Sequence, residues 1–267
     1  MSDLLIALQL HSVRSCMESD FEGTLCKVKE MGYNGVELAD FYGRTPAYIK
    51  QLLDEIGLVP VSMHTSYDAV VNGDPMNLIN QCREAGCKQL VVAWMSAQYR
   101  PGSDQFPDVI RQIGAFGALC NTMGISLSYH NHAFEFVKVG DKYGIDLLLH
   151  EIPAEHLQMQ FDTCWVQVSG ESPAEYLRKY AGRTPTVHLK DYVGIFDENN
   201  YMTQTEEENP DAFFYRPVGY GVQDIPATVQ AAKEAGVTWF IVEQDEPSMK
   251  KTQLQCAEMS LQYLRSL

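Results

Sequence analysis

Three polar residues stand at the ends of apolar, strand-like runs, and their types suit a metal ion. These residues are Asp162, His188 and Glu243. Carboxylate and imidazole groups are the ligands that hold Mn²⁺, Mg²⁺, Co²⁺ or Zn²⁺ in proteins. If the three strand ends lie together, the sequence predicts a site for one divalent cation, with Mn²⁺ as the first candidate.

A fourth strand-like run ends in a dense group of polar residues, Tyr129-His130-Asn131-His132-Ala133-Phe134-Glu135. Two histidines beside an asparagine, with a glutamate three residues later, favour a functional site over a single histidine packed in the core. The spacing leaves open which residue contacts the metal. His130 and His132 share one face if the strand continues, and Glu135 reaches inward only if the chain turns after His132.

Other residues at expected strand ends or in loops are candidates for contact with a substrate. Each also has a plain structural explanation, such as packing or a surface ion pair. Lys190, which follows His188, is a candidate for stabilising a developing oxyanion. The candidates for binding substrate are His64, His130, Glu37, Trp165 and Arg216.

The elements that would position these residues are indicated by five glycines. Each glycine ends a helix-like stretch and is followed within a few residues by an apolar run. A glycine just past a helix adopts the left-handed conformation at little cost, so the chain can turn into a strand. Repetition of this device predicts parallel, buried strands covered by helices. The five glycines are Gly32, Gly57, Gly86, Gly124 and Gly236.

Eight strand–helix units can be placed along the 267 residues, which is the count and size of a (β/α)8 TIM barrel. An open, doubly wound sheet is the alternative, but the turn after the first strand lacks the glycines typical of that fold. We expect a single domain over 1–267, with one long insertion at about 191–222. We expect this insertion to cover the mouth of the barrel as a lid.

Composition and charge exclude several classes of partner. The formal net charge is −15, which disfavours binding to nucleic acid or to an anionic membrane. No apolar run has the length of a membrane span. The seven cysteines are scattered and odd in number, so we expect reduced thiols and a cytoplasmic location. A homo-oligomer is compatible with the sequence.

Taken together, these residues resemble the sugar phosphate isomerase/epimerase family of xylose isomerase-like TIM barrels. The resemblance runs nearly from end to end and is most specific over the last three motifs. The matching segments are Leu8-Gln9-Leu10, Gly35-Val36-Glu37-Leu38, Tyr129–Phe136, Phe161-Asp162, Val187-His188-Leu189-Lys190-Asp191 and Val242-Glu243-Gln244-Asp245.

The resemblance implies one divalent cation held by four side chains, one from each of the fifth to eighth strands of the barrel. The implied ligands are Glu135, Asp162, His188 and Glu243. The family's usual glutamate at the fifth strand is replaced by His130 at the strand tip. Either Glu135 reaches back to complete the set, or His130 takes the place of the glutamate.

The expected activity is that of a sugar isomerase or epimerase acting next to a carbonyl group. Glu243 would remove the proton, Lys190 would stabilise the enediolate, and His132 or Glu135 would return the proton. Loss of a β-hydroxyl or glycosidic oxygen from the same enediolate would instead make the protein a dehydratase or lyase of keto-sugars or inososes. An endonuclease IV-like DNA-repair enzyme and a non-catalytic sugar-binding barrel are the remaining alternatives, and the acidic charge argues against the former.

Overall fold

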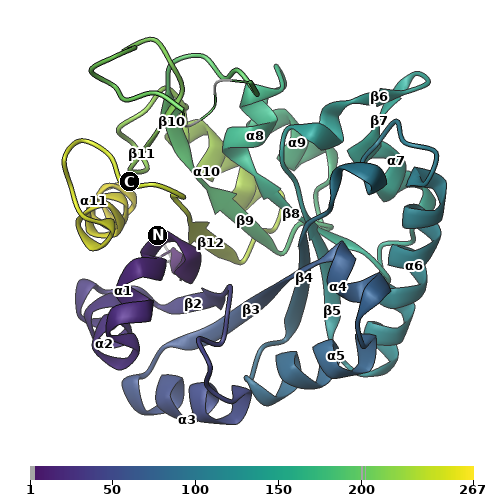
Figure 1. Ribbon diagram of the computed structural model, residues 1–267, viewed down its shortest axis with the longest axis horizontal. Coiled ribbons are helices and arrows are strands. Elements are labelled where there is room, and N and C mark those ends of the chain that lie inside the picture. Colours follow the sequence, from purple (N-terminus) through teal and green to yellow (C-terminus); the bar gives the residue numbers. More distant parts are fainter. Residues whose placement is uncertain (1–3, 200, 202) are drawn as a thin grey trace.

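The computed structural model describes residues 4–199, 201 and 203–267. Eight parallel strands close into a barrel surrounded by helices (Figure 1), which confirms the predicted (β/α)8 fold. Around the barrel the strands are β1 (Leu5–Gln9), β12 (Trp239–Val242), β9 (Thr186–Leu189), β8 (Gln158–Asp162), β5 (Ser126–His130), β4 (Gln89–Trp94), β3 (Val59–Ser66) and β2 (Gly35–Leu38).

Helices cover the outside of the barrel, and their apolar faces pack on the strands in one large core. The helices are α1 (Arg14–Ser19), α2 (Phe21–Met31), α3 (Pro46–Ile56), α4 (Tyr67–Asn72), α5 (Pro75–Glu84), α6 (Phe106–Thr122), α7 (Gly144–Glu151), α8 (Thr163–Val168), α9 (Pro173–Lys179), α10 (Ile225–Glu234) and α11 (Gln253–Arg265). Short 3₁₀ helices are η1 (Leu10–Val13), η2 (Ala97–Tyr99) and η3 (Phe134–Phe136). A small hairpin, β6 (Lys138–Val139) and β7 (Lys142–Tyr143), precedes α7.

The five glycines behave as the sequence predicted. Their φ angles lie between 74° and 106°, which is the left-handed region that glycine favours. Three short helices, α1, α4 and α8, were not expected and begin within one to five residues after strands β1, β3 and β8. Side-chain caps explain two of them, because Ser66 caps α4 and Asp162 caps α8.

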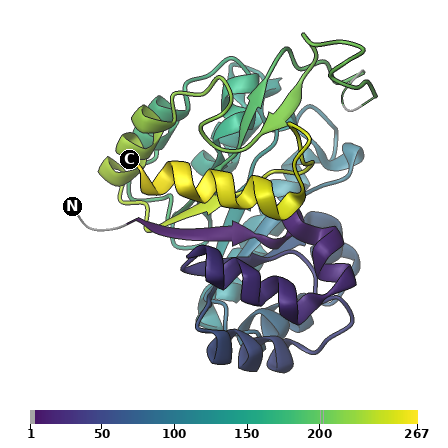
Figure 2. The same cartoon turned by 90° about the vertical axis from the view of Figure 1, so that its left-hand side faces the viewer.

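The insertion 191–222 follows directly after β9 and forms a two-stranded ribbon, β10 (Asp191–Val193) and β11 (Phe214–Arg216). Residues 200 and 202 of this segment lie outside the described residues. The Asp191 carboxylate joins its two ends, because it accepts backbone N–H groups from Tyr192, Gly219, Gly221 and Gln223. The ribbon lies on the side of the molecule toward which β1 points (Figure 2), where the carboxyl ends of the strands meet.

Aromatic side chains of the insertion form a second small core with α8. Trp165 stacks on Phe213 with ring centroids 5.9 Å apart, and Tyr192 and Tyr215 also belong to this cluster. The ordering of the insertion therefore depends on helix α8, which starts at Asp162. Among the helices of the described residues, none is long and apolar enough to cross a membrane.

One close contact between α6 and the barrel gives a test of the packing. A Cβ atom at Gly117 would lie 1.8 Å from the carbonyl oxygen of His156, whereas a Cβ atom at Gly114 would lie at an ordinary 3.6 Å from Ile152. We expect Gly117→Ala to lower the free energy of unfolding by about 1–3 kcal/mol, since backbone must move. The control on the same helix, Gly114→Ala, should be neutral or stabilising by up to about 1 kcal/mol. Urea denaturation of both variants measures this, and equal stabilities would contradict the packing.

Candidate active site

The carboxyl ends of the strands bring the predicted site residues to one end of the barrel. The four side chains His130, Asp162, His188 and Glu243 each offer a ligand atom, and these atoms lie within 4.8 Å of one another. All four are buried. They come from β5, β8, β9 and the end of β12, four neighbouring strands of the barrel.

His130 presents one ring nitrogen to this group because its other nitrogen is engaged. Nδ1 lies 3.2 Å from Gln160 Oε1, which can only accept a hydrogen bond, so Nδ1 carries the proton. Nε2 then holds a lone pair and lies 3.8 Å from Asp162 Oδ2. Burial, with the nearby His188, keeps the pKa of His130 well below its usual value, so the ring is neutral at pH 7.

Asp162 is oriented by the helix that it caps. Its Oδ1 accepts the backbone N–H groups of Cys164 and Trp165, at 2.9 and 3.3 Å, and its own N–H donates to Asn131 Oδ1. The second oxygen, Oδ2, is buried and accepts no hydrogen bond, although the Lys190 ammonium lies 3.2 Å away. Asp162 therefore directs one oxygen to the backbone of helix α8 and the other, beside Lys190, to the group of candidate ligands.

His188 is fully buried and lies between two carboxylates. Its Nδ1 is 2.8 Å from Glu243 Oε2 and its Nε2 is 2.6 Å from Glu37 Oε1. Burial lowers the pKa of His188, but Glu37 and Glu243 outweigh it and raise this pKa to about 10. Glu243 is held ionised in return: burial raises its pKa, and Lys190 and His188 together bring it well below its usual range.

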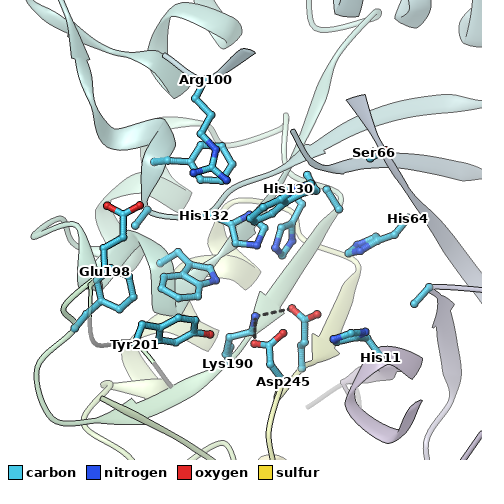
Figure 3. Close-up of a pocket in the computed structure, with 18 of the residues that line it drawn as sticks. His11, His64, Ser66, Arg100, His130, His132, Lys190, Glu198, Tyr201 and Asp245 are labelled. Carbon is cyan, nitrogen blue, oxygen red and sulfur yellow. Dashed lines mark ion pairs between the residues drawn. The ribbon is translucent and has the colours of Figure 1, made fainter. Parts of the chain in front are cut away.

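Lys190 is the positive charge of the pocket floor. Its Nζ lies 2.9 Å from Glu243, 2.9 Å from Asp245 and 3.2 Å from Asp162, and the side chain is almost completely buried. Burial disfavours the ammonium, but the three carboxylates outweigh that effect and keep the pKa of Lys190 well above its usual value. Figure 3 shows Lys190 and Asp245 on one side of the pocket, with His130 and His132 across from them.

The structure separates the two residues that the sequence left as alternatives at the fifth strand. His130 belongs to the group, whereas Glu135 does not. The chain does turn after His132, but the Glu135 carboxylate accepts the Tyr129 hydroxyl at 2.6 Å and the His132 backbone N–H at 2.8 Å. Burial raises the pKa of Glu135 to about 7. The geometry therefore favours His130 over Glu135 as the candidate ligand from the fifth strand.

His132 lies in an aromatic cage at the wall of the pocket. It stacks on Phe134 at 5.5 Å and meets Trp94 edge to face at 5.1 Å. Its Nδ1 is buried without a hydrogen-bond partner. Burial and the charge of Lys190 lower the pKa of His132 to about 3, so the ring is neutral. Glu135 fixes its position through the backbone.

A pocket of about 840 Å³ opens above these groups. Its floor contains His64, His130, Lys190 and Glu243 at the strand ends, and Phe196, Glu198, Tyr201 and Tyr215 of the insertion contribute to its wall. Three of the five predicted substrate-binding residues line this pocket and two do not. His64, His130 and Trp165 line the pocket.

Glu37 and Arg216, the other two predicted substrate-binding residues, are not among the described residues that line the pocket. Glu37 is fully buried beneath the floor and is already bonded to neighbouring side chains. Arg216 pairs with Glu206 at 2.5 Å and donates to the backbone of Tyr215 inside the insertion. Glu37 bonds to His188 and Arg216 bonds within the insertion, so contact of either residue with a substrate stays a prediction.

Sequence reasoning did not identify three residues that the site uses. Gln160 orients both His64 and His130, and the only signal for it was a polar residue inside an apolar run. Asp245 pairs with Lys190, and its signal was its place two residues after Glu243. Arg100 lines the pocket from a loop, where spacing gives no signal.

Comparison with known proteins fits this geometry. The family model described as "Xylose isomerase-like TIM barrel" matches residues 25–267. This chain belongs to that family. An inosose dehydratase of Geobacillus kaustophilus (strain HTA426) is 22% identical over 191 residues, which cover 62% of this chain and 60% of the relative. The chain thus matches less than two thirds of the length of that relative.

Two solved structures share the fold at low sequence identity. A sugar phosphate isomerase/epimerase from Parabacteroides distasonis ATCC 8503 superposes with a TM-score of 0.77 at 19% identity, covering 100% of this chain and 95% of that one. The IOLI protein, solved with a bound zinc atom, has a TM-score of 0.71 at 12% identity and 98% coverage of both chains.

The residues present fit a divalent cation. The buried Oδ2 of Asp162 makes no hydrogen bond and contacts only the Lys190 ammonium among the described cations, and the neutral Nε2 of His130 lies 3.8 Å from it. His188 is bonded through its far nitrogen to Glu37, as metal-binding histidines commonly are to a carboxylate. Two imidazoles and two carboxylates are a donor set suited to Mn²⁺, Co²⁺ or Zn²⁺.

A pair of substitutions distinguishes the two candidates at the fifth strand. We expect His130→Ala to weaken Mn²⁺ binding by at least about tenfold, because a ligand atom is lost. We expect Glu135→Gln to stay within about threefold of the wild type, because among the described residues its carboxylate bonds to the Tyr129 hydroxyl and the backbone of His132 and lies outside the candidate ligand group. Titration calorimetry with Mn²⁺ measures both. The opposite order of the two effects would assign the ligand to Glu135.

Proposed function

We propose that this protein removes the proton next to the carbonyl group of a keto-sugar or keto-cyclitol and eliminates a β-oxygen substituent, as a dehydratase or lyase does. The observation that carries the proposal is the group formed by the buried Lys190 and Glu243 with the partly exposed Asp245 at one side of the pocket floor. The second candidate is the sugar isomerase or epimerase expected from the sequence, which would share the first step.

Glu243 is suited to take the proton. Its carboxylate lines the pocket and is kept ionised by two neighbouring cations, the Lys190 ammonium and the His188 ring. A base must carry no proton before the reaction and must reach the substrate, and Glu243 meets the first condition at neutral pH. Because it is also a candidate ligand, the same residue would serve both roles.

Lys190 is suited to stabilise the oxyanion that develops on the carbonyl oxygen. Its ammonium is fixed by three carboxylates in a buried position, so it needs no reorganisation when negative charge appears. His64 lines the same floor, and its Nε2 lies 2.9 Å from Glu37 Oε1, so the ring is held in place for contact with a substrate.

We propose that His130, Asp162, His188 and Glu243 hold one divalent cation, with Mn²⁺ as the first candidate. When bound, such an ion would act as a Lewis acid toward the carbonyl and the neighbouring hydroxyl. The zinc in the structure of the IOLI protein supports a metal in this family, without fixing its identity here.

The arrangement of acid–base groups favours elimination over epimerisation. Epimerisation needs proton-transfer groups on both faces of one carbon, whereas elimination on one face needs a single group. In that reaction Glu243 would take the C–H proton, the β C–O bond would break, and the departing oxygen would receive the proton from Glu243. Across the floor, the lining residues from the end of β5 and the segment after it include the imidazoles of His130 and His132 and, among the described residues, no carboxylate.

The names of relatives agree with this choice, since the inosose dehydratase of Geobacillus kaustophilus is one of them. Epimerisation would require His132 to return a proton from the opposite face. The two outcomes differ in product, because elimination gives an unsaturated or 1,2-dicarbonyl compound and water, and epimerisation gives a stereoisomer.

Glu243→Gln tests the base directly. The amide keeps the size and one oxygen ligand but cannot take a proton, so we expect turnover of an inosose to fall by at least about 10²-fold while Mn²⁺ is retained. Proton NMR in D₂O follows both the product and deuterium at the carbon next to the carbonyl. The exposed Glu258→Gln serves as the matched control.

Two results would contradict the proposal. An active Glu243→Gln enzyme would remove this residue from proton transfer. A deuterated stereoisomer as the only product of the wild type would favour the epimerase over the dehydratase.

A further inference from the structure

The pocket is larger than the reacting part of the proposed substrate. Its volume of about 840 Å³ lies in the upper part of the range of about 300–1,000 Å³ that binds drug-sized ligands. A single six-membered sugar or cyclitol ring is much smaller than such a ligand. The proposed reacting groups lie at the inner end of the pocket, at the strand ends. The outer end of the pocket therefore has room for a second group of the substrate.

The outer part has an aromatic and apolar wall. We call this the outer wall and define it by Trp94, Arg100, Phe134 and Val137, which come from the last residue of β4 and from the segments after β4 and β5. Trp94 and Val137 are 47% and 48% exposed, although both line the pocket. Exposed apolar side chains inside a concave site are typical of a binding surface.

Trp94 is exposed but held in place. Its ring meets His132 edge to face at 88° and Phe134 at 90°, with centroids 5.1 and 5.6 Å apart. A fixed indole with an open surface can accept a flat ring at little cost in conformational entropy.

Arg100 adds a positive group to this wall. Its guanidinium carbon lies 4.0 Å from the Phe134 ring centre and 4.8 Å from that of Trp94. Within the part of the chain that the structure describes, Arg100 has no carboxylate within ion-pair distance. Its recorded hydrogen bond joins Nε to the Met95 carbonyl at 3.3 Å. Figure 3 shows Arg100 at the opposite end of the pocket from Lys190.

An unpartnered donor lies between the floor and the insertion. The Trp165 side chain is 5% exposed and lines the pocket, yet its indole N–H has no hydrogen-bond partner. Buried N–H groups are nearly always paired, so this one points to an acceptor atom on a ligand. The ring also lies 5.7 Å from the Lys190 ammonium, which places this donor near the reacting end.

We propose that the outer wall is a second subsite that binds an aromatic ring, so that the substrate is a keto-glycoside with an aromatic aglycone. This inference rests on the elimination proposed above. The leaving oxygen would then be the glycosidic one, two carbons from the carbonyl carbon. Glu243 takes the proton from the carbon between them, the glycosidic C–O bond breaks, and the aglycone oxygen receives that proton.

The chemistry of this leaving group agrees with the subsite. The products are an unsaturated keto-sugar and a phenol, with no oxidant or reductant consumed. A phenolate is a better leaving group than hydroxide, because phenols have a pKa of about 10 and bulk water about 15.7. The apolar neighbours of Trp94 favour an aromatic ring over a second sugar, whose hydroxyls would need several polar partners.

Binding of simple glucosides tests the subsite without requiring turnover. Calorimetry compares phenyl α- and β-D-glucopyranoside with the methyl glucosides and with cellobiose. We expect at least one phenyl anomer to bind the wild type at least about tenfold more tightly than its methyl counterpart, since the ring adds buried apolar area. In Trp94→Ala this preference should fall to within about threefold. Tyr48→Ala, which removes an exposed aromatic side chain from α3, should keep it.

Each result decides for or against the subsite. Equal or undetectable binding of both phenyl anomers, a preference that survives in Trp94→Ala, or tighter binding of cellobiose would overturn the aromatic subsite. The outcome is separate from that of the elimination. A wild type that turns over an inosose normally but shows no preference for the phenyl glucosides would refute only this inference. A retained preference with an active Glu243→Gln would refute only the proposed mechanism.

Discussion

One buried carboxylate, that of Glu37, organises the centre of the barrel. It accepts hydrogen bonds from Gln9 at 2.8 Å, Ser62 at 2.5 Å and Gln160 at 2.7 Å, and it pairs with His64 and His188 at 2.9 and 2.6 Å. A buried charge is tolerated only when it is paired and fully hydrogen-bonded. Burial raises the pKa of Glu37, but the two histidines outweigh that effect and keep it well below its usual value. The strands that supply these partners are therefore held in one register, and the two rings above Glu37 are held in one orientation.

The site above Glu37 is a chain of alternating charges that ends in the pocket. His188 joins Glu37 to Glu243, and Lys190 joins Glu243 to Asp245 and Asp162. The cations His188 and Lys190 keep the pKa of Glu243 well below its usual range, and the carboxylates in turn raise the pKa values of both cations. A divalent cation at Asp162 and Glu243 would share those oxygens with the Lys190 ammonium. These buried acidic side chains therefore keep the proposed base Glu243, the Lys190 ammonium and the candidate metal ligands within one small volume.

The sequence was sufficient to predict the barrel and the strand ends, because both depend on local patterns. Glycines after helices and apolar runs fixed the eight units, and the ends of those runs carried Asp162, His188 and Glu243. Other features depended on contacts between distant segments. Whether His130 or Glu135 faces the group was decided by Tyr129, whose hydroxyl bonds to Glu135. The burial of Glu37 depended on five partners spread over 180 residues of sequence, which no local pattern encodes. The open Trp94 surface and the position of Arg100 followed from loop geometry, which spacing does not determine.

The most direct test of this account is a crystal structure of the protein soaked with Mn²⁺, with the ion located by its anomalous scattering. The account predicts one ion bound by His130, Asp162, His188 and Glu243, with His188 still bonded through its far nitrogen to Glu37. A second trio of side chains, His64, His130 and His188, also lies close enough to bind an ion. An ion held by that trio, an ion held by Glu135, or a fully loaded soak without an ion at the strand ends would contradict the account.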